Sequence, residues 1–323
     1  MDWKNIHIDA TTTLLLQRLD DKLQHIKQVR PLPAAALARI KEGLSLEWTY
    51  NSNSIEGNTL TLQETKLVLQ DGMTVKGKSL REHFETVNHH DAVAYIESVA
   101  QAAKPIAEYD VLHTHALVLD KIEKDFSGRF RNAGVRITGA NFTPPNARKV
   151  YDLVHELMHW VNQESGYLHC LVRATVFHHR FVWIHPFFDG NGRTVRLLFN
   201  LLLMKEGYPP AIILRNDRKK YYDALNKANA GDYSKLLLLT CQAMERSLDI
   251  YLSNLDDDAE DYKPITSIVE ESAMPYGYGK EYISLLARRG VIDAYKEGRV
   301  WYTTEKAIHA YVKGRRRKRR LNG

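Results

Sequence analysis

Apolar residues recur at helical spacing along most of the chain, which predicts a mainly α-helical protein. The clearest stripes lie within residues 14–23, 87–96 and 195–204. An acidic run over residues 254–264 ends at Pro264 and is interpreted as a linker. The helical part before it is expected to comprise an N-terminal segment over residues 1–34 and a core domain over residues 35–253.

One stretch inside the core has a different pattern. Residues 135–138 alternate before Gly139, and two prolines, Pro144 and Pro145, follow the turn. The pattern predicts a short β-hairpin, here called the flap. Because proline cannot donate to a strand ladder, the second arm should lie at an edge, where its neighbours can pair with an incoming extended segment.

A smaller unit is predicted over residues 265–313. Residues 265–269 and 280–288 are expected to form short helices, and residues 291–295 and 299–302 paired strands around Glu297 and Gly298. This order resembles a winged helix of the excisionase type, in which a helix commonly enters a DNA groove. The candidate phosphate contacts are Arg288, Arg289, Lys296, Arg299 and the basic tail over residues 314–323. A module for protein interaction or dimer support is an equal alternative.

Composition changes this picture little. The net charge of +6 comes from the tail, because the seven lysines and arginines of residues 313–320 account for it. The only two cysteines, Cys170 and Cys241, form no C-x-x-C pair, which favours a reducing compartment. No signal-peptide pattern or spanning apolar stretch is present, so a cytoplasmic location without a membrane partner is predicted.

The residues suited to chemistry gather within positions 185–196, HPFFDGNGRTVR. Two glycines, Gly190 and Gly192, precede an apolar run, so backbone N–H groups can approach an anion at a helix N-terminus. Arg193 and Arg196 lie on one helical face and offer planar forks to phosphate oxygens. Asp189 is a candidate Mg²⁺ ligand, and His185 is a candidate proton acceptor near neutral pH.

The same segment matches every fixed position of H-P-F-x-D-G-N-G-R-x-x-R, and the chain therefore resembles the Fic family over roughly residues 35–250. The resemblance implies a Fic-type helical core with a β-hairpin flap. It also implies a protein adenylyltransferase, in which His185 deprotonates a hydroxyl of a target protein. The hydroxyl oxygen then attacks the α-phosphate of ATP, and pyrophosphate is released.

Further roles follow from this resemblance. Asp189 would hold Mg²⁺, with Mn²⁺ as an alternative. Asn191 and Gly192 would contact the α-phosphate region, Arg193 the β-phosphate and Arg196 the γ-phosphate. The intervening Gly190 and Thr194 complete this ATP-binding stretch, and the presence of both glycines favours adenylyl transfer over the kinase-like reaction of some family members.

Upstream, residues 52–57 resemble the S/T-x-x-x-E-G/N inhibitory helix of autoinhibited Fic proteins, with Ser52, Glu56 and Gly57 at the defining positions. A Glu56 carboxylate paired with Arg196 would occupy the fork that the γ-phosphate needs. The motif is also a plausible helix end, with Gly57 after the last turn and a capping box from Thr61 and Glu64. The two interpretations are compatible. Removal of AMP at the same site, with Glu56 positioning a water, is left open.

The resemblance also implies contacts outside the motif. Gly139, Ala140, Asn141 and Phe142 of the flap would touch the nucleotide, and the flap would clamp an extended segment of the target. Tyr221, Tyr222 and Asn229 match the stretch that surrounds adenine and ribose. Helical spacing independently predicts one of the two tyrosines in the core. The resemblance leaves a homodimer open, with no surface indicated.

Two competing interpretations remain. The run from His155 to His159 is a formal H-E-x-x-H zinc motif, but Asn162 and Ser165 stand where the extended motif of one protease class has glycine and histidine. Its apolar neighbours favour a core helix instead. The other alternative is a DNA-binding transcription regulator that senses a nucleotide, although pure sensing would not need His185 as a base.

Overall fold

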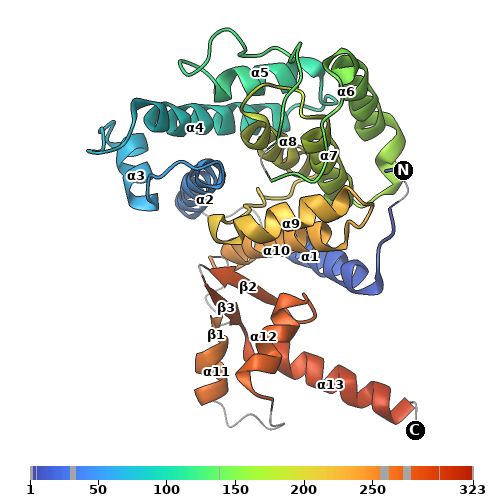
Figure 1. Cartoon of the computed structure of the whole chain (residues 1–323). Coiled ribbons are helices and arrows are strands. Elements are labelled where there is room, and N and C mark those ends of the chain that lie inside the picture. Colours follow the sequence, from blue (N-terminus) through green and yellow to red (C-terminus); the bar gives the residue numbers. More distant parts are fainter. Residues whose placement is uncertain are drawn as a thin grey trace.

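The computed structural model describes residues 3–4, 6–29, 34–137, 139–254, 262–271, 278–297 and 299–321. Helices form a large body from the N-terminus to the end of α10, and a smaller C-terminal unit with a three-stranded sheet lies against one side of it (Figure 1). The prediction of a mainly α-helical chain is confirmed.

The body contains ten α-helices among the described residues. They are α1 (Ala10–Val29), α2 (Ala34–Ile55), α3 (Leu62–Gln70), α4 (Leu80–Ala100), α5 (Glu108–Val118), α6 (Val150–His159), α7 (Cys170–Ile184), α8 (Asn191–Lys205), α9 (Arg218–Ala228) and α10 (Ser234–Leu252). A π-helical turn, Trp160–Glu164, extends α6, and the short turn Arg215–Asp217 precedes α9.

Helix α8 lies at the centre of the body. Every residue from 193 to 203 is buried, and α8 packs against α4, α5 and α7. A helix that is apolar on nearly all sides must be surrounded by other elements to lose its contact with water. The core therefore fixes α8 and brings its N-terminus, which carries the candidate phosphate cradle, into the middle of the fold.

Local signals in the sequence place the helix boundaries around α3. Thr61 and Glu64 form the predicted capping box at its start. Gly57 follows the end of α2 with φ +106°, a backbone angle that favours glycine, so its predicted place after the last turn is confirmed. The link from α2 to α3 is thus held at both ends, which leaves Glu56 at a defined position.

The flap turns at Gly139, as predicted, but the described residues of this stretch form no strand ladder. The N–H of Ala140 donates to the carbonyl of Ile137 at 3.3 Å, which closes the turn. Pro144 and Pro145 offer no N–H to a partner strand, which is one physical reason for the missing ladder. Thr138 lies outside the described residues.

The C-terminal unit contains the two predicted helices and a hairpin, but the first strand begins at Ala294 and not at residue 291, because residues 291–293 form a bend. Its elements are β1 (Lys263–Pro264), α11 (Ile265–Glu271), α12 (Lys280–Arg288), β2 (Ala294–Glu297), β3 (Val300–Thr303) and α13 (Glu305–Leu321). The sheet is antiparallel in the order β1-β3-β2. Strand β1 was not expected, and Pro264 fits there because it lies at an edge. Residues 255–261 of the predicted linker and Gly298 of the hairpin lie outside the described residues.

Helix α13 continues past residue 313 into the stretch expected to be a basic tail. Lysine and arginine are good helix formers, so a run of them can extend an existing helix. Residues 322 and 323 of the tail lie outside the described residues. Among the described helices, none combines the length and the apolar character that crossing a bilayer would require.

Candidate active site

The loop from α7 to α8 has a tightly determined shape. His185 ends α7 in the left-handed region, with φ +51°, and its N–H donates to the carbonyl of Phe181 at 2.9 Å. The amide of Asn191 closes the loop, because its Oδ1 accepts from the N–H of Phe187 at 2.9 Å and its Nδ2 donates to the same residue's carbonyl at 2.8 Å. The side chain of Asn191 thus shapes the loop, and its backbone begins α8.

Gly190 precedes α8 with φ +76°, and its backbone makes a close approach to α5. A Cβ atom at this position would lie 3.3 Å from the ring of His115 and 3.4 Å from Val118. The N-cap residue of α8, Gly190, makes no side-chain hydrogen bond to the helix. The first N–H groups of the helix therefore lack this cap, and their contact with an anion stays a prediction.

His115 supports this loop, and sequence reasoning missed it. The N–H of Gly128 donates to its Nδ1 at 3.0 Å, so Nδ1 carries the lone pair and Nε2 donates to the carbonyl of Asp189 at 3.0 Å. The ring also stacks on Phe187, with centroids 3.6 Å apart. Burial lowers the pKa of His115 to about 4, so the ring is neutral at neutral pH and keeps this tautomer.

His185 has the protonation state that a proton acceptor needs. Burial, together with the charge of Arg131, lowers its pKa to about 4 against the opposing effect of the contact with Val182. The ring nitrogen Nδ1 lies 3.4 Å from the carbonyl of Val182, which can only accept. Donation from Nδ1 to this carbonyl leaves the lone pair on Nε2. The imidazole is therefore neutral at neutral pH, with Nε2 as the basic atom.

A cluster of charges surrounds Asp189. Its Oδ2 lies 2.6 Å from Nη2 of Arg81, and its Oδ1 accepts from the N–H of Gly190 at 2.6 Å and lies 3.6 Å from Arg193. Although burial acts to raise it, the pKa of Asp189 is lowered by these partners. Arg193 is buried and also contacts Glu85 at 3.2 Å. The carboxylate is thus ionised and half exposed beside the start of α8.

Arg196 is buried one helical turn further along α8 and is held by the end of α2. Its Nη1 lies 2.8 Å from Oε1 of Glu56, and its Nε and Nη2 donate to Oγ and the carbonyl of Ser52. A Cβ atom at Gly192 would overlap Oε1 of Glu56. The Glu56 carboxylate therefore lies against both the arginine fork and the first turn of α8.

The flap contacts the end of α9. Nδ2 of Asn226 donates to the carbonyl of Gly139 at 3.2 Å, and Nδ2 of Asn229 donates to Oδ1 of Asn141 at 3.0 Å. Phe142 stacks on Trp183 of α7. The structure thus brings the flap residues and Asn229, all predicted near the nucleotide, to one place.

Comparison with known proteins agrees with this geometry. The Fic/DOC family pattern matches residues 105–203, which include the whole loop between α7 and α8. A solved structure of a Fic-1 fragment from C. elegans, with a single glutamate-to-glycine substitution, is 31% identical. It covers 75% of this chain and 72% of its own, with a TM-score of 0.68. The chain belongs to the Fic/DOC family.

Other Fic proteins extend the comparison. A second structure of the Fic-1 fragment has a TM-score of 0.69 at 29% identity and covers 81% of this chain and 74% of its own. The Protein adenylyltransferase Fic of Drosophila grimshawi is 39% identical over 238 residues, which is 73% of this chain and 49% of the relative. The protein of the same name from Culex quinquefasciatus is 35% identical over 88% of this chain and 58% of its own. The chain spans about half the length of the curated relatives it matches.

The two candidate adenine residues differ within this Fic core. Tyr221 is fully buried, and its hydroxyl pairs with Nε2 of His178 at 2.9 Å, so one tyrosine lies in the core, as helical spacing predicted. Tyr222 is half-buried and lies under the guanidinium of Arg218. Burial raises the pKa of Tyr222, and the charge of Glu56 raises it further. Thr194 is buried, with no hydrogen-bond partner for its hydroxyl among the described residues.

The H-E-x-x-H histidines of the Fic core engage separate carboxylates at the surface. Nε2 of His155 lies 2.7 Å from Glu108, and Nε2 of His159 lies 3.3 Å from Glu164. Helix α6 also changes to π-helical geometry directly after His159. Within the described ranges, no group of three or more histidine, cysteine or acidic side chains is placed to hold a metal ion.

The structure pairs Lys296, one of the predicted phosphate contacts, with the helical body. Its ammonium group donates to Oδ1 of Asp217 in the helical body at 2.9 Å, and its side chain is only 15% exposed. The role of Lys296 as a phosphate contact stays a prediction. Arg288, Arg289 and Arg299 are exposed, and their role as phosphate contacts stays a prediction.

Proposed function

We propose that this Fic protein transfers AMP from ATP to a hydroxyl side chain of a target protein, and that Glu56 restrains the reaction. The observation that carries the proposal is the combination of an uncapped α8 N-terminus with a neutral histidine, His185, at the end of the preceding helix. A phosphate cradle and a base thus flank one loop.

The chemistry assigns one task to each group. Nε2 of His185 accepts the proton of the target hydroxyl, and the oxygen forms a bond to the α-phosphorus of ATP. The bond from that phosphorus to the bridging oxygen breaks, and pyrophosphate leaves with the electron pair. The N–H groups at the start of α8, at Asn191, Gly192 and Arg193, would hold the phosphates, and the forks of Arg193 and Arg196 would neutralise their charge.

Asp189 fits a divalent cation that is shared with a nucleotide. Mg²⁺ is commonly bound by one or two carboxylates together with substrate phosphates, and Asp189 is a single ionised carboxylate beside the cradle. When bound, the cation would neutralise charge between adjacent phosphates. Arg81 and Arg193 now pair with this carboxylate, so nucleotide binding would exchange these partners.

The restraint follows from the position of Glu56. Its carboxylate pairs with Arg196, the residue assigned to the γ-phosphate, and lies against Gly192. The Glu56 carboxylate and the γ-phosphate would therefore compete for the buried guanidinium of Arg196. A charge-assisted contact is worth about 1.5–3 kcal/mol, so its removal should raise AMP transfer roughly tenfold to a hundredfold.

Our first prediction tests both parts of the proposal. The purified chain and three variants, Glu56→Gly, Glu56→Gln and Glu56→Gly/His185→Ala, are incubated with Mg²⁺ and ATP labelled on the α-phosphate. Label on the protein should increase strongly in Glu56→Gly, increase less in Glu56→Gln, which keeps the shape without the charge, and vanish in the double variant.

The matched control is Glu42→Gln, which neutralises an exposed glutamate of α2. It should label like the unaltered chain. Equal labelling of all Glu56 forms would refute the restraint, and full labelling without His185 would refute the assigned base. The clamping of an extended target segment by the flap is part of the proposal, and its support is the contact between the flap and α9.

A further inference from the structure

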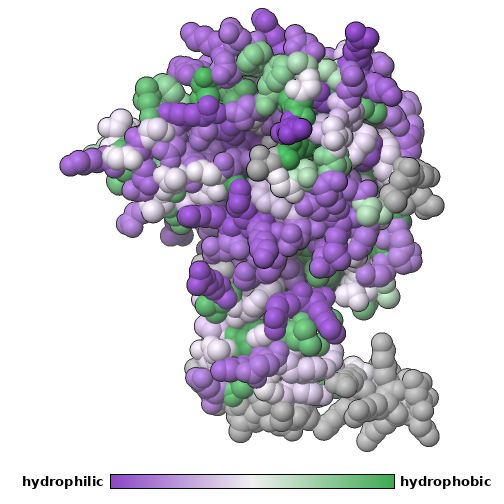
Figure 2. All heavy atoms as spheres, viewed as in Figure 1, coloured by the Kyte–Doolittle hydropathy of each residue, from purple (hydrophilic) through white to green (hydrophobic). Residues whose placement is uncertain are grey.

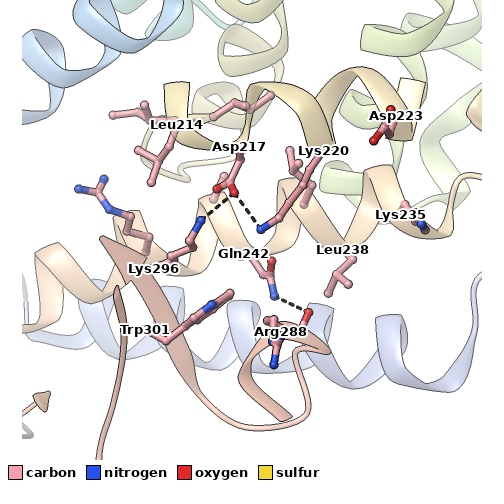
Figure 3. Close-up of a pocket in the computed structure, with 15 residues that line it drawn as sticks. Leu214, Asp217, Lys220, Asp223, Lys235, Leu238, Gln242, Arg288, Lys296 and Trp301 are labelled. Atoms are coloured by element: carbon pink, nitrogen blue, oxygen red, sulfur yellow. Dashed lines mark hydrogen bonds and ion pairs between the residues drawn. The ribbon is translucent and has the colours of Figure 1, made fainter. Parts of the chain in front are cut away.

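A cavity of about 350 Å³ lies where the helical body meets the C-terminal unit (Figure 3). Helices α9 and α10 form one wall, and residues of α12, β2 and β3 close the other. The volume is within the range of small-molecule sites in proteins. Figure 2 shows that the surface narrows at this junction, with apolar residues visible between hydrophilic ones.

The cavity is separate from the candidate active site, although both use α9. Lys220 and Asp223 line the cavity, whereas the neighbouring Tyr221 and Tyr222 lie within reach of the charges of Arg196 and Glu56. Successive residues on a helix point in different directions, so α9 presents one face to each site.

The floor of the cavity is apolar and includes one large aromatic side chain. Ile213, Leu238 and Leu239 contribute from the helical body, and the indole of Trp301 contributes from β3. In Figure 3, Trp301 lies across the cavity from Asp217 and Lys220. An apolar wall of this kind favours the hydrocarbon or aromatic part of a ligand, because burial removes that part from water.

The polar lining is strongly cationic. It includes five basic side chains, Lys220, Lys235, Arg246, Arg288 and Lys296, against two carboxylates, Asp217 and Asp223. Oδ1 of Asp217 pairs with two ammonium groups, that of Lys220 at 3.0 Å and that of Lys296 at 2.9 Å, as the dashed lines of Figure 3 mark. Positive charge in the lining exceeds negative charge by three groups, or by two when Glu47, which pairs with Arg246, is included, and this excess favours an anion.

Arg246 contributes a buried guanidinium to the wall of the cavity. The residue is only 6% exposed, and its Nη2 pairs with Glu47 at 2.7 Å. Its Nε and Nη1 have no hydrogen-bond partner among the described residues. Both atoms are enclosed by protein, so the hydrogen bonds to a ligand in the open cavity fall to the exposed Lys235 and Arg288.

From these features we infer that the cavity between the helical body and the C-terminal unit binds a small amphipathic anion, with its apolar body against Trp301 and its carboxylate or phosphate toward Lys235 and Arg288. Neither the family pattern nor the proposed transfer reaction requires such a ligand. The inference does not depend on AMP transfer, because its test measures ligand binding alone.

The probe is decanoate, used below its micelle concentration and titrated calorimetrically into the full chain. Decyl phosphate replaces the carboxylate by phosphate, and decylammonium keeps the same body with the opposite charge. Decanoate or decyl phosphate should bind at one site, and the stronger of the two identifies the preferred head group. Decylammonium should bind at least tenfold more weakly.

Variants locate the site. Lys235→Glu/Arg288→Glu reverses two exposed charges of the rim and should weaken binding of the anionic probe at least tenfold. The matched control is Lys219→Glu, since Lys219 is the exposed neighbour of Lys220 on α9 and does not line the cavity.

A second measurement reports contact with the wall. 10-Bromodecanoate should quench the tryptophan fluorescence of the unaltered chain, and Trp301→Phe should abolish most of the saturable quenching. The inference is overturned if neither anionic probe binds, if decylammonium binds as well as decanoate, or if the rim variant binds like Lys219→Glu. Quenching that survives in Trp301→Phe would also overturn it, because the probe would then lie elsewhere.

Discussion

At the scale of single residues, the candidate active site depends on the protonation states of its histidines. His115 is held neutral so that Nε2 can donate to the loop, and His185 is held neutral so that Nε2 can accept a proton. Burial produces both states, since it disfavours the charged imidazolium. Burial thus lowers the pKa of both histidines, but Nε2 of His115 donates a hydrogen bond whereas Nε2 of His185 carries the lone pair.

The low pKa of His185 predicts an unusual pH profile for AMP transfer. In Glu56→Gly, the rate should stay level from about pH 8 to about pH 5 and fall only as the pH approaches 4, because protonation of His185 removes the base. Removal of Glu56 also takes away a charge that raises this pKa, which moves the acid limb further down. Initial labelling rates across this range provide the measurement.

The circular dichroism of the same samples serves as the control for unfolding. An exposed histidine would give an acid limb near pH ~6.5. A midpoint there, with the fold intact, would contradict the neutral resting state of His185.

Much of the candidate site could be located from sequence, because residues 185–196 are contiguous and each residue type has a recognisable use. His115 was not predictable. Its partners, Gly128 and Asp189, lie outside its helix, and a histidine within a helix indicates by itself no specific contact. The structural role of the Asn191 amide was hidden for a related reason, since the loop geometry that uses it exists only in the folded chain.

At the scale of elements, the turn after α2 controls where Glu56 lies. Gly57 has φ +106°, outside the left-handed region that other residues tolerate, and a Cβ atom there would meet no neighbour. Gly57→Ala should therefore act through backbone strain of about 1–3 kcal/mol. We expect a lower melting temperature and faster AMP transfer, because relief of the strain displaces Glu56 from Arg196.

Gly72→Ala provides the comparison for this prediction. Gly72 also has open space around it but a φ of +62°, which an alanine adopts at smaller cost. It should leave AMP transfer unchanged. If both glycine variants label alike, the turn does not position the Glu56 carboxylate.

The flap is attached to the active-site loop by one buried side chain, Arg131. Its guanidinium donates to the carbonyls of His185, Ala133 and Pro145, and its own N–H donates to the carbonyl of Pro186. Arg131→Lys keeps the charge but lacks the planar fork. It should release the flap, since at least one carbonyl loses a donor worth about 1.5–3 kcal/mol.

Hydrogen exchange and limited proteolysis of residues 139–142 would report this release as faster exchange and cleavage. Arg129→Lys is the matched control, because Arg129 is an exposed arginine two positions earlier on the same arm. Equal protection in the two variants would show that Arg131 does not anchor the flap.

Arg131 also explains why the flap differs from its prediction. Alternation and a glycine turn are typical of a hairpin, and the turn is present. Sequence reasoning treated the carbonyls of this stretch as strand partners, whereas a buried guanidinium takes up those of Ala133 and Pro145. The helices were predicted more accurately, because their caps and apolar stripes are local signals, as Thr61 and Glu64 show.

At the scale of the whole molecule, a buried charge cluster joins the helical body to the C-terminal unit. Lys22 of α1 contacts Glu245 and Asp249 of α10 and Asp293 of the C-terminal unit, at 3.2, 2.5 and 2.6 Å. Arg18 also contacts Glu245. No local pattern predicts this cluster or the pairing of Lys296 with Asp217, because both depend on how separately formed units pack.

The cluster holds three carboxyl groups and only two basic groups, Lys22 and Arg18. We therefore expect one of the carboxyl groups to keep its proton. Burial raises the pKa of Asp249, and the charges of Asp293 and Glu245 raise it further, in excess of the opposing effect of Lys22. We therefore expect Asp249 to carry this proton in the folded protein.

The last prediction concerns the pH dependence that this proton creates. A carboxyl with a raised pKa stabilises the fold at low pH, and its contribution is lost as the pH rises through the folded-state pKa. Asp249→Asn replaces the protonated form by a neutral isostere, so the variant should gain stability relative to the unaltered chain between pH 6 and pH 9. Urea unfolding at both values measures the difference, and Asp152→Asn, at an exposed position of α6, should show no such change. A relative loss of stability at pH 9 would mean that Asp249 is ionised in the fold and that its pairing with Lys22 outweighs its burial.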